Sequence, residues 1–255
     1  LDVTGSMNRY NRLANLKLAA AYFIDTIYDA AEAGAVSTSV SPYNTQFNAG
    51  ATLLSHFTLD EGAHDYSHCV NFQAEDYRHT GLSTTQVLQQ TMHFDTWSDA
   101  RHSSPGDDLR TPVCPAESTR EILPWSENPQ QLKNHIAAFQ AWGNTSIDIG
   151  LKWGSVLLDP GSRVVASDMI SSGHVDPDLL GRPYNYNDTE TMKIMVVMTD
   201  GVNTSQYYVK DSHRSGPTDV WYDPGSDRVS VWSGDGPVPV AVNDWEVPND
   251  EFFRW

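Results

Sequence analysis

The feature that most constrains the fold of this chain is a nearly continuous run of Ile, Met and Val within residues 193–198, followed closely by Asp200. A run of this composition is typical of a parallel strand that is buried on both faces. In open α/β sheets, ligands bind outside the carboxyl ends of such strands. We therefore expect residues 193–198 to form a central strand, with Asp200 at a ligand-binding edge of the sheet.

The start of the chain supplies a second group of polar side chains, in the sequence Asp-Val-Thr-Gly-Ser at residues 2–6. If this stretch is extended, its period of two places the Asp2 carboxylate and the Thr4 and Ser6 hydroxyls on one side of the backbone. Oxygen ligands with few charges suit a hard divalent cation such as Mg²⁺, Mn²⁺ or Ca²⁺, and suit Zn²⁺ or Cu²⁺ poorly. The alternative interpretation is an ordinary polar turn that binds nothing.

A third polar stretch, Gly-Asn-Thr-Ser at residues 143–146, precedes a helical run. With these three stretches the chain resembles the von Willebrand factor A (VWA) family, whose metal-ion-dependent adhesion site combines Asp-x-Ser-x-Ser, a loop Thr and a strand-end Asp. Thr4 stands where the family usually has Ser, and it keeps the hydroxyl. The resemblance implies that the metal ligands are Asp2, Thr4, Ser6, Thr145 and Asp200.

The chain is more specifically similar to the TadG-like proteins of the bacterial tight-adherence (Tad) pilus system. The stretches that carry this similarity are residues 2–7, 41–46, 114–115, 144–154 and 198–201, which together span most of residues 1–215. The resemblance implies a non-enzymatic adhesion or assembly module in the periplasm or cell envelope, anchored by an N-terminal membrane segment outside this chain. Its expected partner is a pilus or envelope protein that contacts a bound cation, Mg²⁺ before Mn²⁺ or Ca²⁺, through a carboxylate.

The expected fold class is α/β, a VWA-like doubly wound and mostly parallel sheet flanked by helices, over residues 1–200. Apolar residues at intervals of three and four predict three helices, and β-branched or alternating stretches predict strands. The predicted helices are residues 11–33, 130–142 and 147–158, and the strands that accompany 193–198 are residues 35–40, 46–51 and 120–125. Residues 52–120 are expected to be an insertion with a helix at 84–92 and a tip at 103–108, and residues 161–190 a second polar loop.

The two ends of the chain lead us to expect an incomplete domain. The first strand of such a sheet needs several apolar residues before Leu1, and a helix, a strand and a helix are needed after Asp200. Residues 201–255 show no helical periodicity and are expected to be a polar extension or insertion. The final βα units of the fold are therefore expected to be missing.

The charge of the chain bears on its partners. A formal charge of −17, from 33 acidic and 16 basic residues, leaves no cluster of Lys and Arg for a phosphate backbone, so nucleic acid is excluded. An acidic surface also disfavours anionic lipid headgroups, and no apolar run is long enough to span a membrane. We expect contact with a membrane only through a segment absent from this chain.

The chain has two cysteines, Cys69 and Cys114, without the spacing of a zinc or redox motif. The residues alone leave a disulfide and two free thiols equally open. The extracytoplasmic location that the Tad resemblance implies favours the disulfide, which closes a long loop and would stabilise the fold by about 4 kcal/mol.

Two other functions are compatible with the same residues. One is a secreted VWA adhesin that binds a host or matrix ligand. The other is a metal-dependent hydrolase with Asp200 or a histidine as general base, although no histidine neighbours the proposed ligands in sequence. His64 and His68, with Glu61 and Cys69, could form a zinc face, but no second cluster completes a tetrahedral set.

Overall fold

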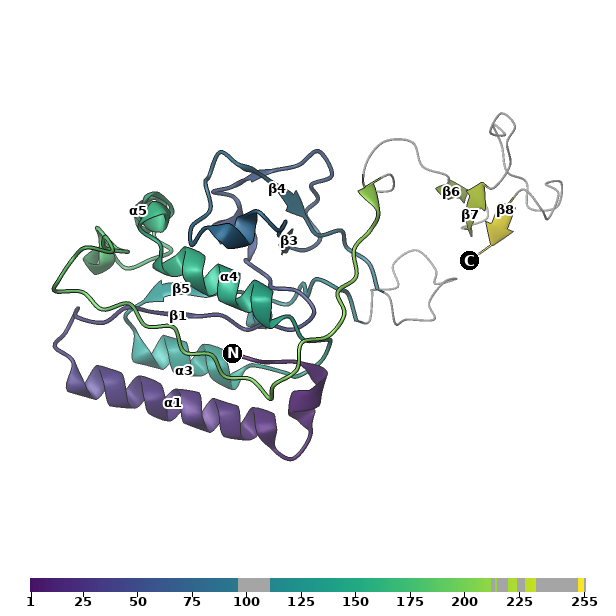
Figure 1. The fold of residues 1–255 in the computed structure, drawn as a ribbon. Helices are drawn as coiled ribbons and strands as arrows, with labels where there is room; N and C mark the ends of the chain where they lie inside the picture. Colours follow the sequence, from purple (N-terminus) through teal and green to yellow (C-terminus); the bar gives the residue numbers. More distant parts are fainter. Residues whose placement is uncertain (96–110, 212–213, 215–219, 224–227, 233–251, 255) are drawn as a thin grey trace. The chain divides into compact units, whose positions relative to one another are not determined.

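The computed structural model describes residues 1–95, 111–211, 214, 220–223, 228–232 and 252–254. The chain divides into two compact units, one of Leu1–His93 and Val113–Tyr208 and the other of Phe94–Pro112 and Val209–Trp255. The first unit combines helices with small sheets that include one parallel strand pair, which is an α/β arrangement (Figure 1). The predicted tip at residues 103–108 lies outside the described residues.

Two helices form one layer of the first unit. These are α1 (Arg12–Ala30) and α3 (Pro129–Ala137), which lie side by side (Figure 1). Each helix buries residues spaced three or four apart on one face, as the sequence predicts. The Asn128 side chain caps α3 by accepting from the backbone N–H groups of Gln130 and Gln131, each at 3.0 Å. The predicted helix at 130–142 is thus confirmed in position, but it ends earlier, at Ala137.

A short strand pair lies between α3 and the helix α4 (Ile147–Leu158) (Figure 1). Strand β1 (Thr38–Val40) pairs antiparallel with β5 (Leu123–Ser126), close to the two predicted strands. The prediction of a strand at 46–51 is wrong, because only Asn48 forms an isolated bridge there and a helical turn begins at Ala51.

The rest of the first unit packs around a large apolar core. Its regular elements are β2 (Thr58–Leu59), β3 (Val70–Asn71), β4 (Val87–Gln90), α4 (Ile147–Leu158) and α5 (Arg163–Ser171). Trp153 of α4 is fully buried and contacts the rings of Phe47, Phe57 and Phe72. At Gly150, one turn earlier in α4, a Cβ would lie 2.7 Å from the Tyr43 ring, so this close approach requires glycine.

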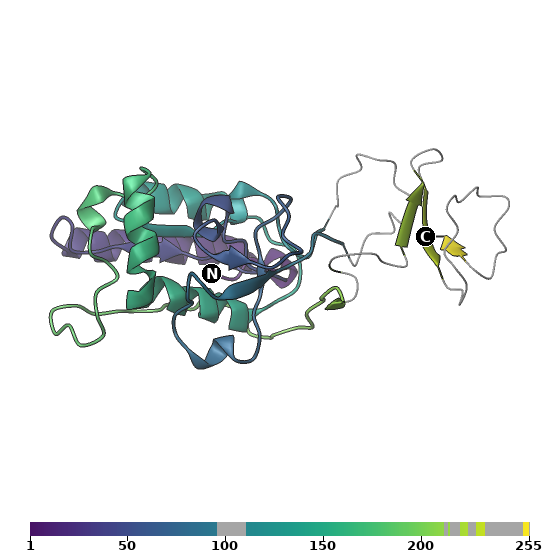
Figure 2. The same cartoon turned by 90° about the horizontal axis from the view of Figure 1, so that it is seen from above.

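Two predictions within these segments are wrong. Residues 84–92 were expected to be helical, yet β4 forms there, paired in parallel with β2 and antiparallel with β3. Residues 161–190 were expected to be a polar loop, yet they contain α5, which lies across the direction of α1 (Figure 2). In both cases burial of a few apolar side chains, Leu88 in β4 and Val165 and Met169 in α5, outweighs a mostly polar local composition.

The apolar run at residues 193–198 is not the buried central strand that its composition predicts. No strand is assigned there, and Ile194, Val196 and Val197 are 62%, 43% and 43% exposed. The run ends beside the start of the chain, where the Asp2 N–H donates to the Met198 carbonyl at 2.9 Å. On the side of this run that faces away from Asp2, no strand of the described residues pairs with it, and Ile194, Val196 and Val197 are therefore left exposed.

The remaining described elements are short. In the first unit they are the turns η1 (Gly5–Asn8), α2 (Ala51–Leu54), η2 (Asp76–Arg78), η3 (Ser118–Arg120), η4 (Pro160–Ser162) and η5 (Pro177–Leu179). The second unit contains an antiparallel sheet of β6 (Val220–Asp223), β7 (Arg228–Trp232) and β8 (Phe252–Arg254). None of the helices in the described part of the chain combines the length and hydrophobicity that crossing a membrane requires.

Cys69 and Cys114 form a disulfide, and both residues are fully buried. Replacing both with alanine is expected to lower the free energy of unfolding by up to about 4 kcal/mol, because the unfolded chain regains the freedom of a 45-residue loop. Urea denaturation measures the loss. Wild-type protein kept in reductant is the control and should lose a similar amount; equal stability of the oxidised and reduced proteins would contradict the prediction.

His135 of α3 is half-buried, and its Nε2 lies 3.0 Å from the Glu121 carbonyl oxygen. Burial lowers the pKa of His135 below its ordinary value of 6.5. The unfolded chain therefore takes up the proton first, and stability is lost as the pH falls from 6.5 through the folded-state pKa. We expect His135→Gln to reduce the slope of stability against pH between about pH 7 and pH 5. Denaturation at several pH values measures it, and identical slopes would refute the assignment.

Candidate metal centre

The Asp2 carboxylate is the centre of the polar network at the start of the chain. Asp2 is fully buried, and its Oδ1 accepts a hydrogen bond from the Thr4 N–H at 2.9 Å. Its Oδ2 accepts from the Thr199 hydroxyl at 2.8 Å and from the Asp200 N–H at 3.4 Å. The two ends of the predicted site therefore meet, although 198 positions separate them.

The Thr4 and Ser6 hydroxyls also come together, with their oxygens 3.0 Å apart. The expectation that residues 2–6 are extended throughout is wrong, because the chain turns into η1 at Gly5. The Gly5 N–H donates to the Gly143 carbonyl and the Met7 N–H to the Thr4 carbonyl, which closes the turn. The turn, rather than strand alternation, brings the two hydroxyls side by side.

The loop that carries Thr145 runs along the same segment. The Trp142 N–H donates to the Val3 carbonyl at 3.0 Å, and the Gly143 carbonyl accepts from Gly5. Thr145 itself is buried, and its backbone N–H donates to the Thr204 hydroxyl at 2.8 Å. Within the described residues its own hydroxyl forms no hydrogen bond. Backbone contacts of Trp142 and Gly143 thus tie the loop that carries Thr145 to the Asp2 segment, and among the described residues no hydrogen bond joins the Thr145 side chain to that segment.

A buried polar stretch at residues 44–46 holds this loop. The Thr45 hydroxyl accepts from the Asn144 N–H at 2.8 Å, and the Thr45 carbonyl accepts from the Ser146 hydroxyl at 2.7 Å. Gly143 has a φ of 80°, and a Cβ there would lie 2.7 Å from the Thr45 Oγ1. Glycine is required at this position for both reasons.

Asp200 has a partner that the sequence pattern did not reveal. The Arg12 guanidinium, at the first residue of α1, lies 2.6 Å from the Asp200 Oδ2. The Asp200 side chain is 11% exposed and that of Arg12 is 40% exposed. No local signal could have indicated this pair, because 188 positions separate the two residues.

Negative charge is concentrated at this site. Burial raises the pKa of Tyr43 to about 12, and the charges of Asp2 and Asp200 act in the same direction. The Tyr43 hydroxyl donates to the Met198 carbonyl at 3.4 Å, beside the same carboxylates. The phenol therefore stays protonated and does not add to the anionic charge.

The donor set fits a hard divalent cation. Asp200 and the hydroxyls of Thr4, Ser6 and Thr145 offer oxygen ligands. The Asp2 carboxylate, which already accepts hydrogen bonds, can bind an ion directly or through a water molecule. The two carboxylates balance the formal charge of such an ion, and the neutral hydroxyls add oxygen ligands without further charge. One feature opposes binding: the Arg12 guanidinium occupies an Asp200 oxygen that a cation would use.

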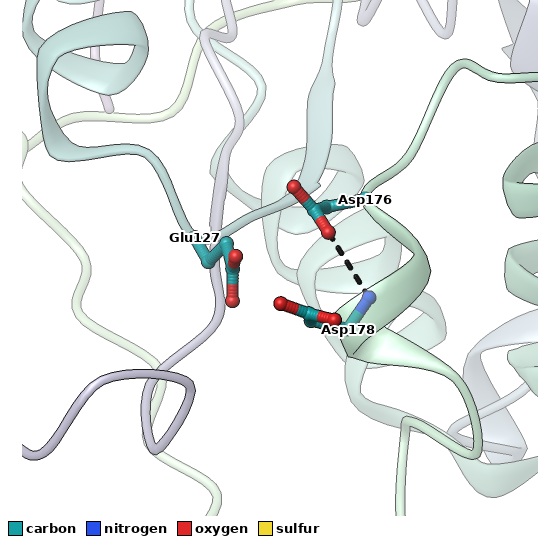
Figure 3. Close-up of side chains that lie close together, drawn as sticks. All are labelled: Glu127, Asp176 and Asp178. Carbon is teal, nitrogen blue, oxygen red and sulfur yellow. Dashed lines mark hydrogen bonds between the residues drawn. The ribbon is translucent and has the colours of Figure 1, made fainter.

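A second acidic group lies elsewhere in the first unit, and the sequence did not predict it. Glu127, Asp176 and Asp178 each place a carboxylate oxygen within 4.8 Å of the others, and Figure 3 shows the Glu127 and Asp178 side chains facing one another. Burial, then the charges of Asp176 and Asp178, raises the pKa of Glu127. Because two of the three residues are exposed, and clusters of this kind are common without an ion, we assign no ligand to it.

The zinc face considered for His64 and His68 lacks one of its candidate ligands. Cys69 is in the disulfide and cannot bind zinc as a thiolate. The His64 ring is already engaged: its Nε2 lies 3.0 Å from the Thr91 carbonyl oxygen and its Nδ1 accepts from the Tyr66 N–H. The zinc face considered from the sequence is therefore not assembled.

Comparison of the chain with protein-family models, with curated proteins and with solved structures found no match. The VWA and Tad resemblance consequently rests on the motifs of the sequence.

Asp2→Ala is expected to lower the free energy of unfolding by about 2 kcal/mol or more in the absence of any cation. The buried Thr4 N–H loses its acceptor, and an unsatisfied buried donor costs about 1–3 kcal/mol. The Thr199 hydroxyl and the Asp200 N–H, which are less buried, also lose their acceptor. Denaturation in EDTA measures the loss. Asp29→Ala, at an exposed position of α1, is the matched control, and equal stability of the two variants would show that the Asp2 network is not structural.

Proposed function

We propose that this chain is a metal-ion-dependent protein-binding module with a VWA-like doubly wound fold. The observation that carries the proposal is the meeting of Asp2 with Thr199 and Asp200, beside the paired Thr4 and Ser6 hydroxyls. Hydrogen bonds thus join the start of the chain to residues 199 and 200, and this supports the arrangement that the VWA resemblance implies. Mg²⁺ is the proposed ion, with Mn²⁺ and Ca²⁺ as alternatives.

The proposed mode of action is capture of an acidic side chain on a partner protein. Where neutral hydroxyls and water occupy the side of the ion that faces a partner, an anionic oxygen is attracted there, and Mg²⁺ retains waters that a ligand can replace. A partner carboxylate is a suitable replacement, because carboxylate oxygens are ligands that Mg²⁺ prefers. No bond is made or broken, so the proposed role is adhesion rather than catalysis.

The proposed setting is a Tad-type pilus assembly protein of the bacterial cell envelope. The support is the set of stretches named above, of which residues 41–46, 144–146 and 198–200 all lie in the network around Asp2. The disulfide between Cys69 and Cys114 suits an oxidising compartment. The proposed partner is therefore a pilus or envelope component.

The cation site is tested by thermal unfolding with and without Mg²⁺ or Mn²⁺. A cation that binds the folded state alone raises the melting temperature, because the free energy of unfolding increases with the logarithm of the ratio of free ion to Kd once the ion exceeds Kd. We expect a rise for the wild type and none for Asp200→Ala. Asp178→Ala is the matched control, because it removes one carboxylate from the second acidic group. Loss of the rise in Asp178→Ala alone would move the ion to that group and refute the proposal.

The partner is tested by affinity capture from a pilus-forming strain, with Mg²⁺ and with EDTA. The proposal expects a pilus or envelope protein that is retained with Mg²⁺, released by EDTA and absent with Asp200→Ala. Capture that is unchanged by EDTA would refute metal-dependent binding. Selective binding of host matrix proteins instead would favour the secreted adhesin.

A further inference from the structure

Arg12 is the one basic group paired with the proposed ligands among the described residues, and its position is electrostatically unusual. It begins α1, where the helix dipole disfavours a positive charge, and the first turn of α1 holds no acidic residue. The charge of Arg12 is instead balanced from outside the helix, by the Asp200 Oδ2 at 2.6 Å. Tyr10 and Asn11, just before it, both have positive φ values, 54° and 58°, and this turn sets where the helix begins.

We propose that Arg12 is a competing counterion that occupies Asp200 until a divalent cation displaces it. The inference rests on the proposed cation site. An ion bound through the Asp200 carboxylate meets the guanidinium at the oxygen that it needs, and two positive charges at that distance repel one another. Either the cation or Arg12 therefore holds this oxygen, and the affinity of the site for metal depends on how readily Arg12 leaves.

Displacement of Arg12 is feasible because its charge is not buried. Its side chain is 40% exposed, and its guanidinium carbon lies 5.4 Å from the centre of the Tyr10 ring, which belongs to a residue that is 83% exposed. The freed guanidinium can thus enter water without breaking another ion pair of the described residues. Asp2, in contrast, is fully buried and held by three donors, so it remains the fixed part of the site.

The competition predicts that removing the guanidinium tightens metal binding. Binding of Mn²⁺ is measured directly, from the loss of the free-ion electron paramagnetic resonance signal during titration at low ionic strength. We expect Arg12→Gln to lower the Mn²⁺ dissociation constant about two- to fivefold, the range that loss of a partly exposed ion pair supports. Arg12→Lys keeps the charge and should stay closer to the wild type.

Arg9→Gln is the matched control. Arg9 is exposed, lies three positions away, and forms no ion pair with another described residue, so its loss changes the net charge equally without opening Asp200. Melting temperatures of all variants in EDTA verify that each is folded. We expect Arg9→Gln to change the Mn²⁺ dissociation constant less than Arg12→Gln does.

The outcomes separate this inference from the function on which it rests. If the wild type binds Mn²⁺, Asp200→Ala does not, and Arg12→Gln binds no more tightly than the wild type or Arg9→Gln, the competition is refuted and the cation site stands. If only Arg12→Gln binds, the competition is supported in its strongest form. If none of these proteins binds Mn²⁺, both the competition and the proposed cation site are refuted.

Discussion

A carboxylate that is buried must be satisfied by hydrogen bonds or charge, and in this protein the rest of the site depends on how Asp2 meets that requirement. Its oxygens accept from Thr4 in the same segment and from Thr199 and Asp200 almost two hundred residues later. These bonds hold the start of the chain against the end of the 193–198 run. They also fix the backbone of Asp200, and therefore the place from which its side chain reaches Arg12.

The second support is a polar segment that is buried where apolar residues would be expected. Residues 44–46 are almost inaccessible, and Thr45 receives hydrogen bonds from both sides of Thr145. Backbone groups of Val3 and Gly5 bind the same loop at Trp142 and Gly143. A network of this kind rigidifies a site because every member restricts its neighbours. Among the described residues, the hydroxyl of Thr145 takes no part in this network.

The electrostatics of the site follow from the same contacts. Hydrogen bonds stabilise the charge of Asp2, and the charge of Asp200 is balanced by Arg12, so each carboxylate has partners within the protein itself. A cation that binds there gains the oxygens but has to replace a guanidinium. In the proposed competition, the stability of the fold and the affinity for a cation would both depend on the single ion pair between Arg12 and Asp200.

The sequence by itself determined what depends on neighbouring residues: the periodicity of α1, α3 and α4, the Asn128 cap, and the polar stretches that the resemblance singles out. It misjudged residues 84–92 and 193–198, because partners remote in sequence decide whether an apolar stretch becomes a strand and whether it is buried. Only the tertiary structure decided that Thr199 holds Asp2 and that Arg12 holds Asp200. Local preferences are encoded within a few residues, whereas contacts across almost two hundred positions exist only once the whole chain has folded around them.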